Sequence, residues 1–290
     1  MAKNNVVIAC DSACDLSKEI ITKNNIHVIP LHISMGDTDI LDNGSITSAD
    51  IYDRYNKDKT LPKTAAFSIQ TAIDVFEKYT SEGKEVVYIS ISSKLSSCYQ
   101  NASIAAEDID NVYIVDSKSI SAGTSLVVAE ACRLRDSGLN ACEIAEKLNE
   151  FKDRISLTFV IDEIDFLRAG GRCSAVAAMA ANIMKLHPCI SSEDGMLKSH
   201  KKYRGKMDKV YYDYAEDVLK GEIDNSREAF IVTSGNIDTH HLMEIKHMVE
   251  SKLGYEPGVD FPESIAIVDA GCTIASHCGP GTLGIIYVRK

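Results

Sequence analysis

Short apolar runs alternate with amphipathic stretches through the first half of the chain. NVVIAC, VVYISI and NVYIVD are continuous runs rich in Val and Ile, which is typical of buried strands, and HVIPLHISM is interpreted as one further strand. Between these runs the apolar spacing predicts helices that begin at or near Leu16, Ala49, Thr71, Leu95 and Ser121. Strands that alternate with helices imply right-handed crossovers and a mostly parallel sheet flanked by helices.

The pattern changes after about Arg154. ISLTFVI, EAFIVTSG, IAIVDAG and TLGIIYVRK predict strands, residues 193–195 predict a hairpin turn, and helices are expected from Lys206 and from Asp238. A hairpin and closely spaced strands favour antiparallel pairing. We therefore predict a two-domain α/β protein, with an N-terminal domain over residues 1–155 and a C-terminal α/β domain with antiparallel pairing over residues 156–290.

Small polar residues follow three of the predicted parallel strands, in the segments CDSACD, SSKLSS and DSKS. The carboxyl ends of parallel strands share one edge of a sheet, where helix N-termini and free backbone N–H groups bind ligands. Each Ser or Asp taken singly is explained by capping of the helix that follows it. Three such segments together favour a binding site at this edge.

Composition narrows the class of partner. The chain has 290 residues and a formal net charge of −11, which would repel nucleic acid and anionic membranes. No apolar run approaches the roughly 20 residues that span a bilayer, and the first residues are too polar for a signal peptide, so we expect a cytoplasmic protein. Nine cysteines without the spacing of a zinc site fit buried, reduced thiols, and we expect no metal.

The sequence contains no common nucleotide or nucleophile motif. Glycine-rich segments at residues 170–172 and 279–284 lack the spacing of phosphate-binding loops, and there is no GxSxG elbow. Nucleotide binding by this chain is therefore disfavoured, and no cofactor is expected. His277 precedes a Cys-Gly-Pro-Gly turn, where it serves either as a functional group or as a hydrogen-bond partner of the loop backbone.

Two further stretches allow alternative interpretations. Residues 198–206, KSHKKYRGK, gather five Lys or Arg residues, which form either a solvated face or a patch that docks an acidic partner or a phosphate. Residues 175–184, AVAAMAANIM, predict a helix of mostly small residues. Such a helix either packs closely against a neighbour or lines a slot for an apolar ligand.

Seven short segments, in order, resemble the DegV family of bacterial fatty-acid-binding proteins along nearly the whole chain. Where the family usually reads KTSQPS, this chain has Lys63-Thr64 followed by Ala65-Ala66-Phe67-Ser68. The matching segments are Asp11-Ser12 with Asp15, Lys63-Thr64, Ser92 to Ser96 with Tyr99-Gln100, Val115-Asp116-Ser117, Leu167 to Arg172, Tyr203-Arg204-Gly205 and His277 to Gly281.

The resemblance implies a two-domain carrier that buries one long-chain fatty acid in an apolar tunnel. In the family, the bound carboxyl group is presented to a separate ATP-dependent kinase subunit that makes acyl phosphate. Carried onto this chain, Thr64, Ser93 and Ser96 would bind the carboxylate. Arg172 and His277 would line the exit toward the incoming phosphate, and Arg204 would belong to the kinase-docking face. The helix at residues 175–184 then becomes a wall of the tunnel.

Hydroxyl groups at a helix N-terminus suit a carboxylate that must remain nucleophilic. They donate hydrogen bonds without the bidentate clamp of an arginine, which would oppose attack on a phosphate. The alternative prediction is an enzyme acting alone in acyl transfer or hydrolysis, with Ser93 as nucleophile and His277 as general base.

Overall fold

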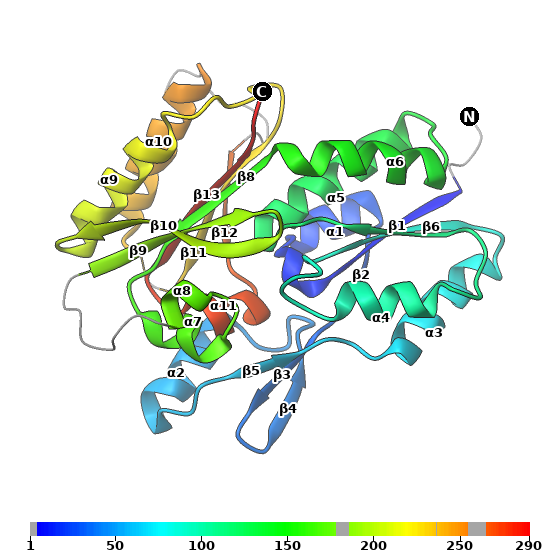
Figure 1. Cartoon of the computed structure of the whole chain (residues 1–290), viewed down its shortest axis with the longest axis horizontal. Helices are drawn as coiled ribbons and strands as arrows, with labels where there is room; N and C mark the ends of the chain where they lie inside the picture. The colour runs from blue at the N-terminus through cyan, green and yellow to red at the C-terminus, as the bar shows by residue number, and fades with distance from the viewer. Residues whose placement is uncertain (1–4, 178–185, 236, 255–264) are drawn as a thin grey trace.

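The computed structural model describes residues 5–177, 186–235, 237–254 and 265–290. Two large sheets lie side by side, one built from the first half of the chain and one from the second, with a small three-stranded sheet below them (Figure 1). The predicted α/β fold class is confirmed.

The first sheet has the strand order β2-β1-β6-β7, and every neighbouring pair is parallel. Its strands are β1 Val6–Asp11, β2 His27–Ile29, β6 Glu85–Ser90 and β7 Val112–Asp116. The helices of this half are α1 Lys18–Asn24, α3 Ile69–Thr80, α4 Cys98–Ala105, α5 Ser121–Asp136 and α6 Ala141–Phe151, with short 3-10 turns η1 Ser12–Cys14 and η2 Lys152–Arg154. The alternation of apolar runs and helices thus predicted this sheet correctly.

The interpretation of HVIPLHISM as one strand is wrong, because the segment divides between two sheets. β2 ends at Ile29, and β3 His32–Met35 pairs antiparallel with β4 Thr38–Leu41 and β5 Lys63–Ala65 in the three-stranded sheet. Pro30, between β2 and β3, has no N–H to donate to a strand ladder. The Leu31 N–H donates to Ser12 Oγ at 3.1 Å, and the chain turns out of the first sheet here. Helix α2, Ser48–Asp58, then connects β4 to β5.

The second sheet has the order β10-β9-β8-β13-β11-β12 and is antiparallel except between β11 and β12. Its strands are β8 Ile155–Val160, β9 Leu186–Glu193, β10 Met196–Arg204, β11 Ala229–Ser234, β12 Ile265–Asp269 and β13 Thr282–Val288. Asp194 and Gly195 connect β9 to β10 with φ values of 47° and 79°, as a two-residue hairpin turn requires. The predicted hairpin and antiparallel pairing are confirmed.

Five helices accompany the second sheet within the described residues: α7 Ile164–Gly170, α8 Ser174–Ala177, α9 Met207–Val218, α10 Thr239–Leu253 and α11 Cys272–Cys278. α9 and α10 lie on one side of the sheet, whereas α7, α8 and α11 cluster near the three-stranded sheet (Figure 1). The small-residue helix expected over residues 175–184 falls mostly outside the described residues.

One apolar core continues from the first sheet to the second. Helix α5 packs against β1 and β6 on one side and against β8 and β13 on the other. Along β13, Leu283 and Ile285 face the core beneath α9 and α10, whereas Ile286 and Val288 face the core shared with the first sheet. The chain enters the second sheet at Ile155, where the domain boundary was expected, and the division of the chain into two domains stays a prediction.

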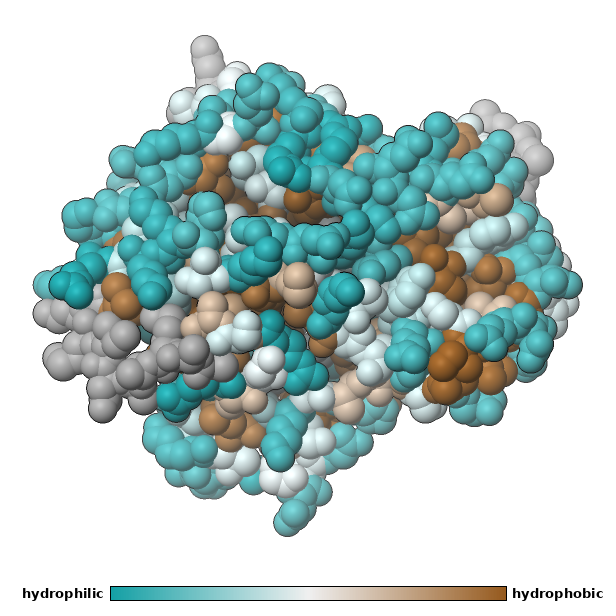
Figure 2. Space-filling view, viewed as in Figure 1, coloured by the Kyte–Doolittle hydropathy of each residue, from teal (hydrophilic) through white to brown (hydrophobic). Residues whose placement is uncertain are grey.

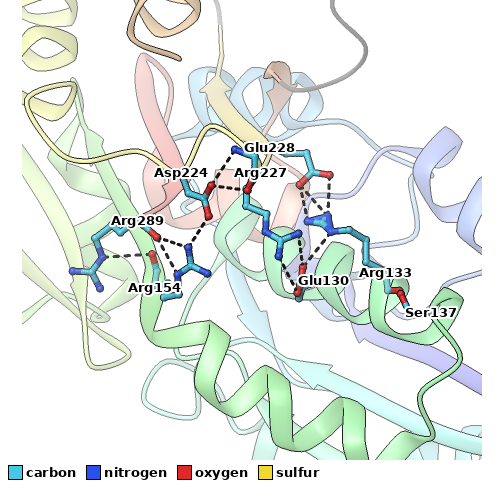
Figure 3. Close-up of polar contacts among 9 residues, drawn as sticks. Glu130, Arg133, Ser137, Arg154, Asp224, Arg227, Glu228 and Arg289 are labelled. Atoms are coloured by element: carbon cyan, nitrogen blue, oxygen red, sulfur yellow. Dashed lines mark hydrogen bonds and ion pairs between the residues drawn. The ribbon is translucent and has the colours of Figure 1, made fainter. Parts of the chain in front are cut away.

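Ion pairs also join α5 to the segment that precedes β11 (Figure 3). Arg133 donates to both carboxylate oxygens of Glu228, with distances of 2.8 to 3.1 Å, and Arg227 lies 3.2 Å from Glu130. Apart from Glu130, which is buried, these side chains are partly exposed, so each pair adds only modest stability. Their geometry nevertheless fixes the orientation of α5, whose first residue, Ser121, lines the cavity described below.

Tyr214 on α9 fixes the central strands of the second sheet. Its buried hydroxyl donates to the Thr158 carbonyl at 2.7 Å and accepts from the Ile285 N–H at 2.9 Å. We expect Tyr214→Phe to lower the free energy of unfolding by about 1–3 kcal/mol, because it removes two hydrogen bonds to buried backbone groups. Urea denaturation measures this change. Tyr55→Phe, at a half-buried position on α2, is the control. An equally small loss of unfolding free energy in both variants would contradict the assignment.

Candidate functional site

A cavity of about 300 Å³ lies between the two large sheets. Its walls are mostly apolar and come from both halves of the chain, with contributions from Leu31, Ile91, Ile120, Leu157, Phe159 and Ile286. Figure 2 shows apolar surface recessed between hydrophilic rims near the middle of the molecule. The volume is at the lower end of the range of small-molecule sites, roughly 300–1,000 Å³.

One part of the cavity wall is polar, and it contains most of the predicted site residues. Thr64 on β5 and His277 on α11 are joined by a hydrogen bond of 2.7 Å between Oγ1 and Nε2, although they are far apart in the sequence. Ser96 and Arg172 line the same cavity. The structure therefore brings together four of the residues that the sequence assigned to carboxylate binding and to the exit.

Arg172 lies at the rim of the cavity and is exposed. Its guanidinium donates to the Gly170 carbonyl at 2.6 Å and to the Leu95 carbonyl at 3.3 Å. These two bonds connect the end of α7 to the residue before Ser96. A positive charge is thus held close to the polar part of the cavity.

His277 is neutral under ordinary conditions. Burial, and to a lesser extent the charge of Arg172, lowers the pKa of His277 to about 4. Its Nδ1 atom is buried and has no hydrogen-bond partner. A methyl group on Gly170 would lie 2.2 Å from this nitrogen, so only glycine allows the end of α7 to pack against the imidazole ring.

Ser93 is predicted to bind the carboxylate together with Thr64, but it does not line the cavity that Thr64 lines. Its side chain is exposed, and its hydroxyl donates to Asp116 at 2.5 Å. The neighbouring Ser92 points the opposite way and donates to the Gly195 carbonyl at 2.7 Å. The turn after β6 therefore directs Ser93 outward, and the Ser93–His277 pair required for the enzymatic alternative is not formed.

Of the two serines in this segment that are predicted to bind the carboxylate, only Ser96 lines the cavity. Its half-buried side chain lines the cavity. At the start of α4 its hydroxyl accepts from the Cys98 N–H at 3.3 Å and donates to Cys98 Sγ at 3.1 Å. Ser97, which the sequence analysis did not select, lines the cavity beside it. Only its place within the SSKLSS segment could have indicated Ser97.

Hydroxyl groups elsewhere on the cavity wall were also missed. Ser121 donates to Asp15 at 2.5 Å, Thr273 donates to Asp42 at 2.6 Å, and Thr282 donates to the Cys278 carbonyl at 2.8 Å. Because each proton is directed to a protein acceptor, none of these three donors requires a partner inside the cavity. Because their donors are satisfied within the protein, these polar residues can line a largely apolar space.

Asp15 and Asp42 hold the N-terminus of α11. The Gly271 N–H donates to Asp15 at 2.9 Å, and the Thr273 N–H donates to Asp42 at 3.1 Å. Burial raises the pKa of Asp15 to about 8, so this carboxyl takes up a proton near neutral pH. Both aspartates come from the first half of the chain, and the helix that they cap carries His277.

The remaining sequence predictions concern residues outside the cavity. Arg204 is exposed at the end of β10 and does not line the cavity, so its role in docking stays a prediction. In the described parts of the chain, no cluster of His, Cys, Asp and Glu is suited to a metal ion, and no helix is long and apolar enough to span a bilayer. Eight of the nine cysteines are buried, Cys142 being the exposed one.

The fold and the site together define an α/β protein with a largely apolar cavity between its two large sheets. The family model described as "Uncharacterised protein, DegV family" matches residues 5–290, and the chain belongs to this family. A DegV domain-containing protein of Staphylococcus aureus strain COL is 30% identical over 293 residues, covering 98% of this chain and 99% of that protein. One of Clostridium perfringens is 29% identical over 289 residues, with 98% and 99% covered.

Solved structures of similar fold include proteins that bind fatty acids. A stearic-acid-binding protein of Eubacterium ventriosum matches with a TM-score of 0.83 and 28% identity, covering 98% of each chain. A Thermotoga maritima protein with fatty acid binding function matches with a TM-score of 0.79 and 26% identity, covering 98% of this chain and 99% of that one. A DegV protein of Thermus thermophilus, at 24% identity and a TM-score of 0.84 over 99% and 100% of the chains, shares the fold.

The lowered pKa of His277 makes a prediction about stability in acid. Because the unfolded chain binds a proton at this residue below about pH 6.5 and the folded chain only near pH 4, stability falls between these values as the pH decreases. We expect the free energy of unfolding, measured by urea denaturation, to fall by about 2 kcal/mol less in His277→Gln than in the parent when the pH is lowered from 7 to 4.5. The exposed His240→Gln variant should behave like the parent, and equal pH dependence in all three proteins would contradict the assignment.

Proposed function

We propose that this protein binds a long-chain fatty acid, with the acyl chain in the cavity between the sheets and the carboxylate at Thr64 and Ser96. The observation that carries this proposal is the hydrogen-bonded pair of Thr64 and His277 at the polar part of an otherwise apolar cavity. Membership of the DegV family and the fatty-acid-binding relatives support the same function.

The neutral state of His277 explains how Thr64 would serve as a donor. When His277 carries its proton on Nε2, it donates to Thr64 Oγ1, and the hydroxyl proton of Thr64 is then free to donate to a carboxylate. The Ser96 hydroxyl donates to the sulfur of Cys98, a weak acceptor, and would turn from it to give the carboxylate a second donor. The charge of Arg172 favours an anion nearby. Neutral donors hold the carboxylate without neutralising its oxygens, which keeps the acid reactive toward an electrophile.

The acyl chain would supply most of the affinity. Burial of a methylene group contributes about 0.8 kcal/mol, so a sixteen-carbon chain offers on the order of 10 kcal/mol before the entropic cost of ordering it. Each hydrogen bond to the head group adds about 1–2 kcal/mol. The chain therefore determines how tightly an acid binds, and the hydroxyl groups determine its direction.

We further propose that the bound carboxyl group is presented to a separate ATP-dependent fatty acid kinase. The resemblance to the family suggests this partner, and the sequence contains no phosphate-binding loop of its own. Arg172 at the rim would lie close to the incoming phosphate, and Arg204 would contact the kinase.

Native mass spectrometry of the purified protein, before and after removal of lipid, tests the binding of a fatty acid directly. We expect an adduct in the mass range of a long-chain fatty acid, which is released by solvent extraction and restored by added acid. A protein that carries no such adduct and takes up none would contradict the proposed function.

The roles of the hydroxyl groups are tested by three single variants. We expect Thr64→Val and Ser96→Ala to weaken fatty acid binding by about 5- to 30-fold, which corresponds to the loss of one hydrogen bond of about 1–2 kcal/mol to a charged group. Isothermal titration of the delipidated proteins measures this change. Ser93→Ala is the control and should bind like the parent, because Ser93 is bonded to Asp116 outside the cavity. An equal loss in Ser93→Ala would restore Ser93 to the site.

The kinase partnership predicts a separation of binding from turnover. We expect Arg204→Ala to bind fatty acid normally but to support less acyl phosphate formation when a DegV-dependent fatty acid kinase and ATP are added. Trapping acyl phosphate with hydroxylamine measures the product. Lys147→Ala, at an exposed position on α6 outside the basic stretch of residues 198–206, is the control. Unchanged turnover in Arg204→Ala would remove this residue from the docking surface.

A further inference from the structure

Gly284 is the third residue of β13, where the second sheet forms a wall of the cavity. The strand register places Gly284 opposite Phe159 on β8 and opposite Val232 on β11. All three residues line the cavity, so they form one row across the sheet, with a missing side chain in the middle of the row. Within the described residues, no other glycine lines this cavity.

The backbone does not require glycine at this position. Gly284 is not among the residues with positive φ, so any L-amino acid could adopt its extended conformation. A glycine inside a strand is destabilising relative to alanine and marks a place where another group approaches the backbone closely. The backbone conformation therefore does not explain the glycine, and the atoms that surround its missing side chain must be considered instead.

The space above Gly284 is narrow enough for one methyl group to change it. A methyl group on its Cα would lie 3.1 Å from Ile286 Cδ1, 3.3 Å from the Thr158 carbonyl oxygen and 3.4 Å from Phe159 Cβ. The end of the Ile286 side chain is the flexible neighbour among these, and it also lines the cavity. An alanine at position 284 would therefore narrow the cavity both directly and by displacing Ile286.

We propose that Gly284 is a specificity-determining position that keeps the cavity wide enough for an acyl chain with lateral bulk, such as a bend or a branch. This inference rests on the proposed function. A straight saturated chain has the same width along its length, so it gains little from a single widened place in the wall. A chain with a cis double bond or a methyl branch needs additional width at one point.

Binding of three acids with comparable chain lengths tests this proposal: a straight saturated acid, a cis-unsaturated acid and a methyl-branched acid. Calorimetry compares the delipidated parent with Gly284→Ala. We expect the variant to lose roughly fourfold in affinity for each methylene group that can no longer be buried. This loss should fall on the bent acid, the branched acid or both, and which of them is affected identifies the form of lateral bulk that the cavity accepts.

A second variant guards against a folding defect. Gly284→Ala combined with Ile286→Val removes the closest contact of the new methyl group, and Ile286→Val alone provides its reference. Ile285→Val, on the opposite face of the same strand, is the control and should leave the preference among the acids unchanged.

The possible outcomes separate this inference from the proposed function. Equal affinity changes for all three acids, or no change in either Gly284→Ala protein, would overturn the role of Gly284 while leaving fatty acid binding intact. Failure of the parent to bind any of the three acids would overturn the proposed function itself.

Discussion

The candidate site depends on how helix α11 is held. Asp15 and Asp42, both from the first half of the chain, accept the backbone N–H groups of Gly271 and Thr273 at the start of this helix. The helix is only seven residues long and would not be stable alone, so these contacts and its packing against α7 and α2 determine its position. His277 lies in its last turn, and the hydrogen bond to Thr64 forms only when the helix stands in this place. A contact between the two halves of the chain thus positions the polar group of the cavity.

The same arrangement shows how an apolar cavity can tolerate polar walls. Free hydroxyl donors inside it would favour water over a hydrocarbon chain, but Ser121, Thr273 and Thr282 direct their protons to protein acceptors. Thr64 differs from them because its partner, the neutral His277, can act as the donor of their shared hydrogen bond. Hydroxyl groups of the same chemical kind therefore have different roles, which are set by the hydrogen-bond partners around them.

Sequence patterns predicted the elements better than they predicted the directions of side chains. Alternating apolar runs were sufficient to predict the parallel sheet. Thr64, Ser96 and His277, which were selected from the ordered family segments, line one cavity, and their roles there stay predictions. The sequence segments could not show that Ser93 and Ser96 point in different directions, because the direction of a side chain in a turn depends on tertiary partners such as Asp116. Pro30 was visible in the sequence, but its effect as the end of β2 was overlooked. Gly284 ends the glycine-rich segment at residues 279–284, but its importance depends on which face of β13 meets the cavity.

Helix α5 has a consequence for how molecules exchange with the interior. It is packed between the two large sheets, and nearly all of its apolar residues are buried. A hinge motion that separates the two sheets would expose this whole surface to water. The free-energy cost is about 25 cal/mol for each Å² of apolar area exposed. Displacement of Ala65 and Arg172, which are exposed at the edge of the cavity, would expose far less apolar area. The architecture therefore favours local opening at the edge of the cavity over a hinge motion that separates the two sheets.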